Sequence, residues 1–113
     1  MTKTFCVDTF HATFHFKVNM EEFSKIAQEM NEFWMGSDSR LKKRNGCHVK
    51  AILSIIAGRV ACYMIGEGYH ANGALKYLGQ QEGFPSNLGE MIECVYDDVP
   101  EFSSDEWSIE EQL

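Results

Sequence analysis

Two histidines near the N-terminus are the first residues whose spacing could support chemistry. His11 and His15 lie four positions apart, and two histidines at this spacing on a helix could share a metal ion. The stretch around them alternates apolar and polar residues, which is typical of a half-buried strand. Along a strand the two side chains stand roughly 13 Å apart, too far for a metal ion with ligand bonds of about 2 Å. We therefore expect surface histidines and no metal site.

A cysteine followed by a histidine, Cys47-His48, opens the longest apolar stretch of the chain. A thiol at a helix N-terminus can act as a nucleophile, but neither a CxxC partner nor a nucleophile motif accompanies it. The glycines of 66–68 and Gly73 follow a helix pattern, without a Lys-Ser or Lys-Thr pair after them, and indicate helix ends and turns. We expect no cofactor and no enzyme; a site at Cys47, His48 or His70 is the least favoured hypothesis.

Carboxylates are concentrated in the last quarter of the chain. Residues 90–113 contain nine Asp and Glu and no Lys or Arg, whereas residues 1–89 contain eight acids and all ten bases. The negative net charge of the chain, −7, therefore comes from its C-terminal end. Pairs such as Asp97-Asp98 and Glu110-Glu111 could act as acids and bases, but nothing predicts a pocket that would shift their pKa values. The run is a surface feature that bears on partners and solubility.

Aromatic residues lie within this acidic stretch and make it a candidate binding surface. Rows of carboxylates can imitate DNA, which carries one charge per about 1.7 Å of axis, and can so occupy a basic groove. Aromatic side chains in such a surface can serve as anchors. A purely solubilising acidic surface is the alternative. The predicted partner-binding residues are Glu93, Tyr96, Asp97, Asp98, Glu101, Phe102, Asp105, Glu106 and Trp107.

A basic cluster, comprising Arg40, Lys42, Lys43, Arg44 and Lys50, lies in the middle of the chain. It lacks the interleaved aromatic residues that stack on nucleic-acid bases, and the chain as a whole is acidic, so we expect no direct nucleic-acid binding. A solvated loop is the simplest interpretation. Pairing with the acidic end of a second copy is an alternative.

The elements that would position these residues follow from hydrophobic periodicity. Two strands are expected in residues 3–18, and Asn19 is expected to cap a helix. That helix would bury one stripe of side chains, namely Phe23, Ile26, Ala27, Met30, Phe33 and Trp34. A short helix is expected at residues 70–78. A third strand is expected at residues 91–96, with Ile92, Cys94 and Tyr96 on one face.

The stretch 45–68 predicts a central helix that is apolar on more than one side. Lys50 and Arg59 interrupt it, and no stretch reaches the ~20 uninterrupted apolar residues of a membrane span. The start of the chain lacks an apolar signal region, so we expect a cytoplasmic protein without membrane contact. The four scattered cysteines are then expected to be reduced and mostly buried. Surplus apolar surface on the central helix could form a homodimer interface.

This order of elements predicts a small α+β fold. A three-stranded antiparallel sheet, in β-β-α-α-β order, would pack on two main helices with a short third helix. The length of 113 residues fits one domain. We assign residues 1–102 to this domain and residues 103–113 to an acidic C-terminal tail or short helix.

Four segments in order, FCVDTFHATFHFKV, NEFWMG, VKAILSIIAGRVA and GFPSNLGEMIECV with its acidic tail, resemble a family of small, functionally unassigned proteins of bacteria, phages and other mobile elements. The resemblance covers most of the chain and is one of pattern. Small acidic proteins of such elements are often inhibitors of host defence, including anti-CRISPR and antirestriction proteins. The resemblance carries over no functional residues.

Charge layout and resemblance together give the functional expectation. We expect a non-enzymatic acidic protein that inhibits a nucleic-acid-handling defence complex in the host cytoplasm. Its most specific form is an anti-CRISPR protein that blocks a Cas effector by occupying a basic surface. The alternative is a homodimeric structural or regulatory module of a phage or mobile element, without nucleic-acid mimicry.

Overall fold

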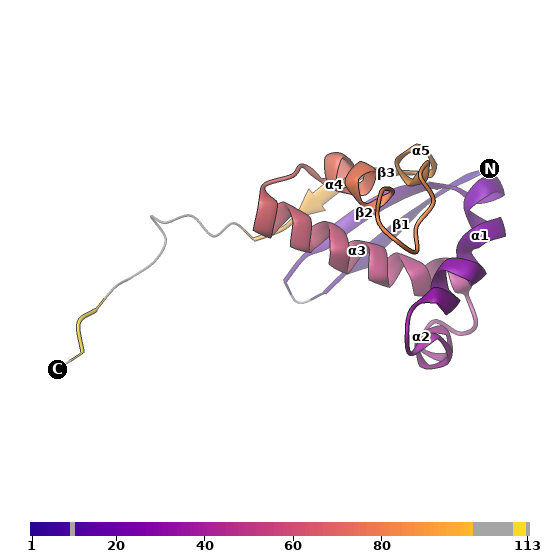
Figure 1. Cartoon of the computed structure of the whole chain (residues 1–113), viewed down its shortest axis with the longest axis horizontal. Helices are drawn as coiled ribbons and strands as arrows, with labels where there is room; N and C mark the ends of the chain where they lie inside the picture. The colour runs from indigo at the N-terminus through magenta and orange to yellow at the C-terminus, as the bar shows by residue number, and fades with distance from the viewer. Residues whose placement is uncertain (10, 101–109, 113) are drawn as a thin grey trace.

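A computed structural model describes residues 1–9, 11–100 and 110–112. The described chain folds into a three-stranded antiparallel sheet with helices packed on one of its faces (Figure 1). In chain order the elements are β1 (Thr2–Asp8), β2 (Thr13–Asn19), α1 (Met20–Phe33), α2 (Ser37–Lys43), α3 (His48–Glu67), α4 (Ala71–Leu78), α5 (Leu88–Met91) and β3 (Ile92–Asp98). This confirms the predicted α+β class, and α2 and α5 are helices beyond the three that the periodicity predicts.

β2 is the central strand of the sheet, between β1 and β3. Its residues alternate as the sequence predicts, because Phe14, Phe16 and Val18 are buried whereas Lys17 is exposed. Phe5 of β1 lies opposite Phe16. The buried and half-buried apolar side chains of the three strands thus face the helices, and no described element covers the other face.

α3 is the core helix of the fold, and Figure 1 shows it running across the sheet. By length and composition alone it could cross a membrane. Its buried side chains, however, join the core cluster that includes the sheet residues, as those of a central helix in a globular domain do. The buried residues of α3 are Val49, Ala51, Ile52, Leu53, Ile56, Ala57 and Val60.

The apolar surface of α3 away from its buried side is only partly covered by the rest of the described chain. Ile55 is half-buried and packs against the core. Cys62 is exposed, and Ile65 is 43% exposed. The uncovered part is therefore confined to the C-terminal half of the helix.

The N-terminus of α1 forms as predicted, and its C-terminus does not. Asn19 caps the helix, since its Oδ1 accepts a hydrogen bond of 3.2 Å from Glu21 N. The prediction that Phe33 is buried is wrong, because its side chain is 50% exposed. α1 ends at this residue and the chain turns, so the next side chain, Trp34, takes the inward position against the core.

Candidate functional site

The site begins with a β-bulge in β3, the strand that carries the first of the predicted acidic residues. β3 pairs with β2 in a register that shifts between His15 and Phe16. His15 lies opposite Tyr96 and Phe16 lies opposite Cys94, so Val95 is an extra residue without a partner in the ladder. The prediction that Tyr96 shares a face with Ile92 and Cys94 is therefore wrong. A shift of one residue moves every later side chain to the opposite face.

The bulge places two apolar side chains together on the uncovered face of the sheet. Val95 is 52% exposed and Tyr96 is 51% exposed. The Tyr96 ring contacts the ring of His15, with 4.9 Å between centroids and a tilt of 46°. His15 is itself half-buried by this contact, so the two rings form a fixed aromatic pair on β2 and β3.

Carboxylates border this pair on the same face. Glu93 lies opposite Lys17, and Asp98 lies opposite Thr13, and both acids are exposed. We call the surface formed by His15, Glu93, Val95, Tyr96 and Asp98 the open-face patch. It offers an apolar centre with the carboxylates of Glu93 and Asp98 at its border, and the exposed Lys17 lies on the same face opposite Glu93.

Four of the nine predicted binding residues fall in the described part of the chain. Glu93, Tyr96, Asp97 and Asp98 all lie on β3 and are exposed. Asp97 lies opposite the buried Phe14 and so belongs to the helix-facing side at the end of the strand. The other five predicted residues, Glu101, Phe102, Asp105, Glu106 and Trp107, lie outside the described residues. His15 and Val95 were missed, because only the bulge and the cross-strand register bring them into the patch.

The cysteines are less buried than expected. Cys94 is buried and Cys47 half-buried, whereas Cys6 and Cys62 are exposed, so the prediction of mostly buried thiols is wrong. Burial raises the pKa of the Cys94 thiol, the charge of Asp97 raises it further, and a hydrogen bond with the backbone of Tyr96 opposes both. The raised pKa favours the neutral form of the Cys94 thiol beneath the patch.

The basic cluster divides into one structural residue and several solvated ones. The Arg40 guanidinium donates to Asn31 Oδ1 at 2.6 Å and to the carbonyl oxygens of Asn31, Trp34 and Met35 at 2.7, 3.1 and 3.0 Å. Arg40 thus binds the C-terminal carbonyl groups of α1. The remaining members, Lys42, Lys43, Arg44 and Lys50, are exposed.

The residues of the enzymatic hypothesis do not converge. Cys47 and His48 lie at the start of α3, and His70 lies beyond its end. A helix of 20 residues is about 30 Å long, which keeps the two places apart. Within the described ranges, no group of three or more His, Cys, Asp and Glu residues is placed to hold a metal ion.

Comparison with known proteins assigns the chain to a family. A family model described as "Protein of unknown function (DUF2528)" matches residues 13–109, and the chain belongs to this family. The expected membership of a functionally unassigned family is thereby confirmed. No curated protein and no solved structure matches the chain.

Proposed function

We propose that this member of the DUF2528 family is a non-enzymatic binding protein that occupies a basic surface of a nucleic-acid-handling complex through its open-face patch. One observation carries the proposal. The β-bulge turns Val95 and Tyr96 to the same uncovered face, where Glu93 and Asp98 border them. An apolar anchor within a charged rim is the arrangement that protein interfaces use.

The two parts of the patch have different tasks. The Tyr96 ring is held by His15, so little side-chain freedom remains to be lost when a partner covers it. The carboxylates attract Lys and Arg side chains of the partner, which speeds encounter and makes it dependent on salt. Affinity should therefore depend mainly on Val95 and Tyr96, and association rate on the acids.

The specific form of the proposal follows from the resemblance to proteins of mobile elements. The partner would be a Cas effector or another defence complex in the host cytoplasm, and binding would block its contact with nucleic acid. Expression of the protein in cells that carry defined CRISPR–Cas systems, challenged by a targeted phage, tests this form. If phage plating is not restored in any system, the anti-CRISPR form is wrong and only the wider binding proposal stands.

The binding proposal itself is tested with two variants of the patch. Glu93→Gln with Asp98→Asn should slow association with the partner and flatten its salt dependence. Tyr96→Ala should speed dissociation, with a loss of affinity of about 2 kcal/mol or more if the ring is an anchor. The matched control is Glu22→Gln with Glu29→Gln, which removes two exposed acids of α1 on another side of the molecule. Unchanged binding by both patch variants would refute the proposal.

A homodimeric module is the second candidate, and the exposed Ile65 side chain of α3 favours it. Sedimentation equilibrium at tens of micromolar separates the two functions. A monomer under those conditions removes the dimer hypothesis. A dimer that Ile65→Glu dissociates would support it.

A further inference from the structure

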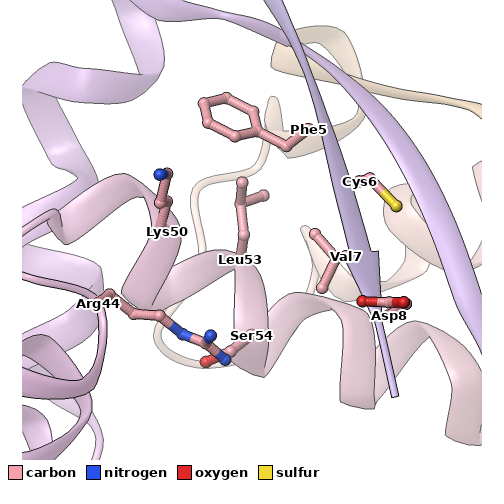
Figure 2. A pocket seen from close by; sticks show the side chains of 8 residues that line it. All are labelled: Phe5, Cys6, Val7, Asp8, Arg44, Lys50, Leu53 and Ser54. Atoms are coloured by element: carbon pink, nitrogen blue, oxygen red, sulfur yellow. The ribbon is translucent and has the colours of Figure 1, made fainter. Parts of the chain in front are cut away.

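A groove runs along α3 beside β1, on the helix side of the sheet and away from the open-face patch. One part of it is a hollow of about 210 Å³ between β1 and α3. Figure 2 shows Phe5 and Val7 pointing from β1 toward Leu53 across this hollow. A second hollow of about 240 Å³ continues along α3. The two hollows form one groove, because both are lined by Val7, Asp8, Arg44 and Ser54.

The end of the groove nearer the start of α3 is positively charged. Arg44 and Lys50 line it, and both side chains are exposed. Within the described ranges neither side chain takes part in a hydrogen bond or an ion pair. Asp8 is the one acid among the lining residues, and its carboxylate points to the other face of β1 from Val7, since successive side chains of a strand alternate. The two cations are thus available to an anionic group of a ligand.

The rest of the groove is mostly apolar and follows one side of α3. Ser54, Gly58, Ala61 and Ile65 line it at intervals of four, three and four residues, which places them in one row along the helix. The buried Phe14 of β2 also lines this part. The groove therefore joins a cationic end to an apolar channel.

We propose that this groove binds a single aliphatic chain that ends in an anionic group, a carboxylate or a phosphate. The anionic group lies at Arg44 and Lys50, because a guanidinium binds both kinds of anion through paired hydrogen bonds. The aliphatic chain follows the row from Ser54 toward Ile65. Small-molecule sites commonly combine a mostly apolar lining with a few polar groups that fix the orientation of the ligand.

The apolar channel restricts the class of ligand. The side chains of Ala57 and Ala61 offer no hydrogen bond, and Gly58 has no side chain. A sugar or a nucleotide would leave polar groups without partners along this row, which is costly. An aliphatic chain loses no hydrogen bond there and gains from leaving water.

The length of the channel sets the length of the ligand. Ser54 and Ile65 are eleven positions apart on α3, which corresponds to about 16 Å of helix. Carbon–carbon bonds of about 1.5 Å advance an extended chain by about 1.3 Å each, so roughly twelve carbons span the row. Affinity should rise about fourfold per methylene from octanoate to dodecanoate. It should level off at hexadecanoate, and a continued rise at the same rate would contradict a channel of this length.

Calorimetric titration of the full-length chain with four probes of equal tail length tests the charge of the ligand. Decanoate and decyl phosphate carry anionic heads, decanol a neutral head and decylamine a cationic head, and each is used below its micelle concentration. The two anions should bind about tenfold more tightly than decanol, because hydrogen bonds to charged groups are the stronger ones. Decylamine should bind most weakly. Equal affinities for all four probes would overturn the proposal, and the tighter of the two anions identifies the head group as carboxylate or phosphate.

Gly58→Leu blocks the channel without strain. Gly58 is exposed on α3 and lines the groove, and an added Cβ there would meet nothing within 4 Å. Leucine favours a helix more than glycine does, so the variant should unfold at the same or a higher temperature. Its affinity for decanoate should nevertheless fall about tenfold or more, because the leucine side chain occupies the place of the aliphatic chain.

Gly66→Leu is the matched control for the blocked channel. Gly66 lies on the same helix with nothing within 4 Å of an added Cβ, and it lines neither hollow. This variant should bind decanoate as wild type does. Equal affinities of Gly58→Leu and Gly66→Leu would refute the site.

Arg44→Gln with Lys50→Gln tests the cationic end. The affinity for decanoate should fall about tenfold, whereas the affinity for decanol should stay unchanged, since only the anion uses the two cations. Lys25→Gln with Lys42→Gln is the matched control, because both residues are exposed and neither lines the groove. A loss of decanoate affinity no larger than in this control would overturn the assignment of the anionic group.

NMR spectra of the ¹⁵N-labelled chain locate the ligand. Decanoate should shift the amide signals of Gly58 and Ala61 and leave those of Glu93 and Val95 on β3 in place. Shifts at β3 alone would overturn the groove as the site. If the Gly58 and Ala61 signals move with protein concentration in the absence of ligand, the groove is an interface between two copies and the proposal is wrong. The open-face patch takes no part in these measurements, so failure of the ligand site leaves the proposed function standing, and the reverse also holds.

Discussion

The side-chain amide of Asn72 on α4 pairs with the backbone of Cys94 on β3 through two hydrogen bonds. Cys94 N donates to Asn72 Oδ1 at 2.7 Å, and Asn72 Nδ2 donates to Cys94 O at 3.0 Å. An amide side chain has the same donor and acceptor as a peptide group, so Asn72 takes the place of a neighbouring strand at this point of the sheet edge. The pairing lies directly before Val95 and fixes the strand where the bulge begins.

Replacement of Asn72 by alanine should therefore destabilise the fold and loosen β3. Loss of both hydrogen bonds is expected to lower the free energy of unfolding by about 1–3 kcal/mol, because two backbone groups lose their partner. Asn72→Asp keeps the acceptor and loses the donor, so it should fall between wild type and alanine. Urea unfolding measures the change.

Asn87→Ala is the control for this substitution. Asn87 is also exposed, but its side chain makes no capping hydrogen bond to α5. Its removal should change stability by less than about 0.5 kcal/mol. Equal effects at both positions would show that the pairing with Cys94 contributes nothing to stability.

Arg40 gives a second prediction, because it binds four acceptors at the end of α1. Arg40→Ala should lower the free energy of unfolding by about 2–3 kcal/mol, since it leaves the buried Asn31 side chain without its charged partner. Arg40→Lys should recover little, because an ammonium group cannot reproduce the planar array of donors. Lys42→Ala, on the same helix and exposed, should be nearly neutral. Equal urea midpoints for the Arg40 and Lys42 variants would contradict this role.

Arg40 also illustrates where sequence reasoning ends. The charge cluster 40–44 is visible in the sequence, but nothing in its spacing distinguishes the one arginine that turns inward from its solvated neighbours. That difference arises because α1 ends at Phe33 and exposes its last carbonyl groups beside α2. Contacts between α1 and α2 determine which basic residue turns inward, and these contacts cannot be read from a single sequence.

The elements themselves were predictable where one periodicity holds over many residues. β2 and α1 follow periods of 2 and 3.6 because each has one face against a common core. α3 was predictable as the longest apolar stretch of the chain, since it is buried on more than one side. The binding face of β3 was not predictable, because an unpaired residue at Val95 reverses the alternation and leaves no mark in composition. The sequence therefore predicted Glu93 and Asp98 on the surface, where the structure has them, but predicted the wrong orientation for Tyr96. Partner binding at these residues stays a prediction.

Gly83 lies against the aromatic side chains at the end of α1, Phe33 and Trp34, and provides a third prediction. Its φ of +93° is unfavourable for other residues, and an added Cβ would lie 2.6 Å from Phe33 Cδ1 and 3.2 Å from Trp34 Cζ2. Gly83→Ala should therefore destabilise the fold by about 1–3 kcal/mol. The thermal midpoint should fall by about 4–8 °C for each kcal/mol.

Gly66 is the matched glycine for this experiment. It lies in the last turn of α3, and an added Cβ there would meet nothing within 4 Å. Gly66→Ala should leave the thermal midpoint unchanged or raise it, because alanine favours a helix by up to about 1 kcal/mol. A loss of stability at Gly66 as large as that at Gly83 would remove the steric explanation.

The buried Cys94 thiol predicts a loss of stability at alkaline pH. Its pKa is raised in the folded protein, mainly by burial. The unfolded chain therefore releases the proton first as the pH rises, and the folded state, which retains it, becomes less stable relative to the unfolded state. The contribution of the Cys94 thiol to folding stability is complete below the usual thiol pKa of about 8.5. It is lost as the pH rises through the raised pKa of the folded protein.

Urea unfolding of wild type and Cys94→Ala between pH 7 and 10.5 isolates this contribution from that of lysines and tyrosines, which both proteins share. The stability of wild type should fall more steeply above pH ~8.5 than that of the variant. The exposed Cys62 provides the control, and Cys62→Ala should keep the wild-type slope. Iodoacetamide should also modify Cys6 and Cys62 well before Cys94, since the first two thiols are exposed and Cys94 is buried. Parallel pH profiles for wild type and Cys94→Ala would show that the Cys94 thiol ionises alike in both states.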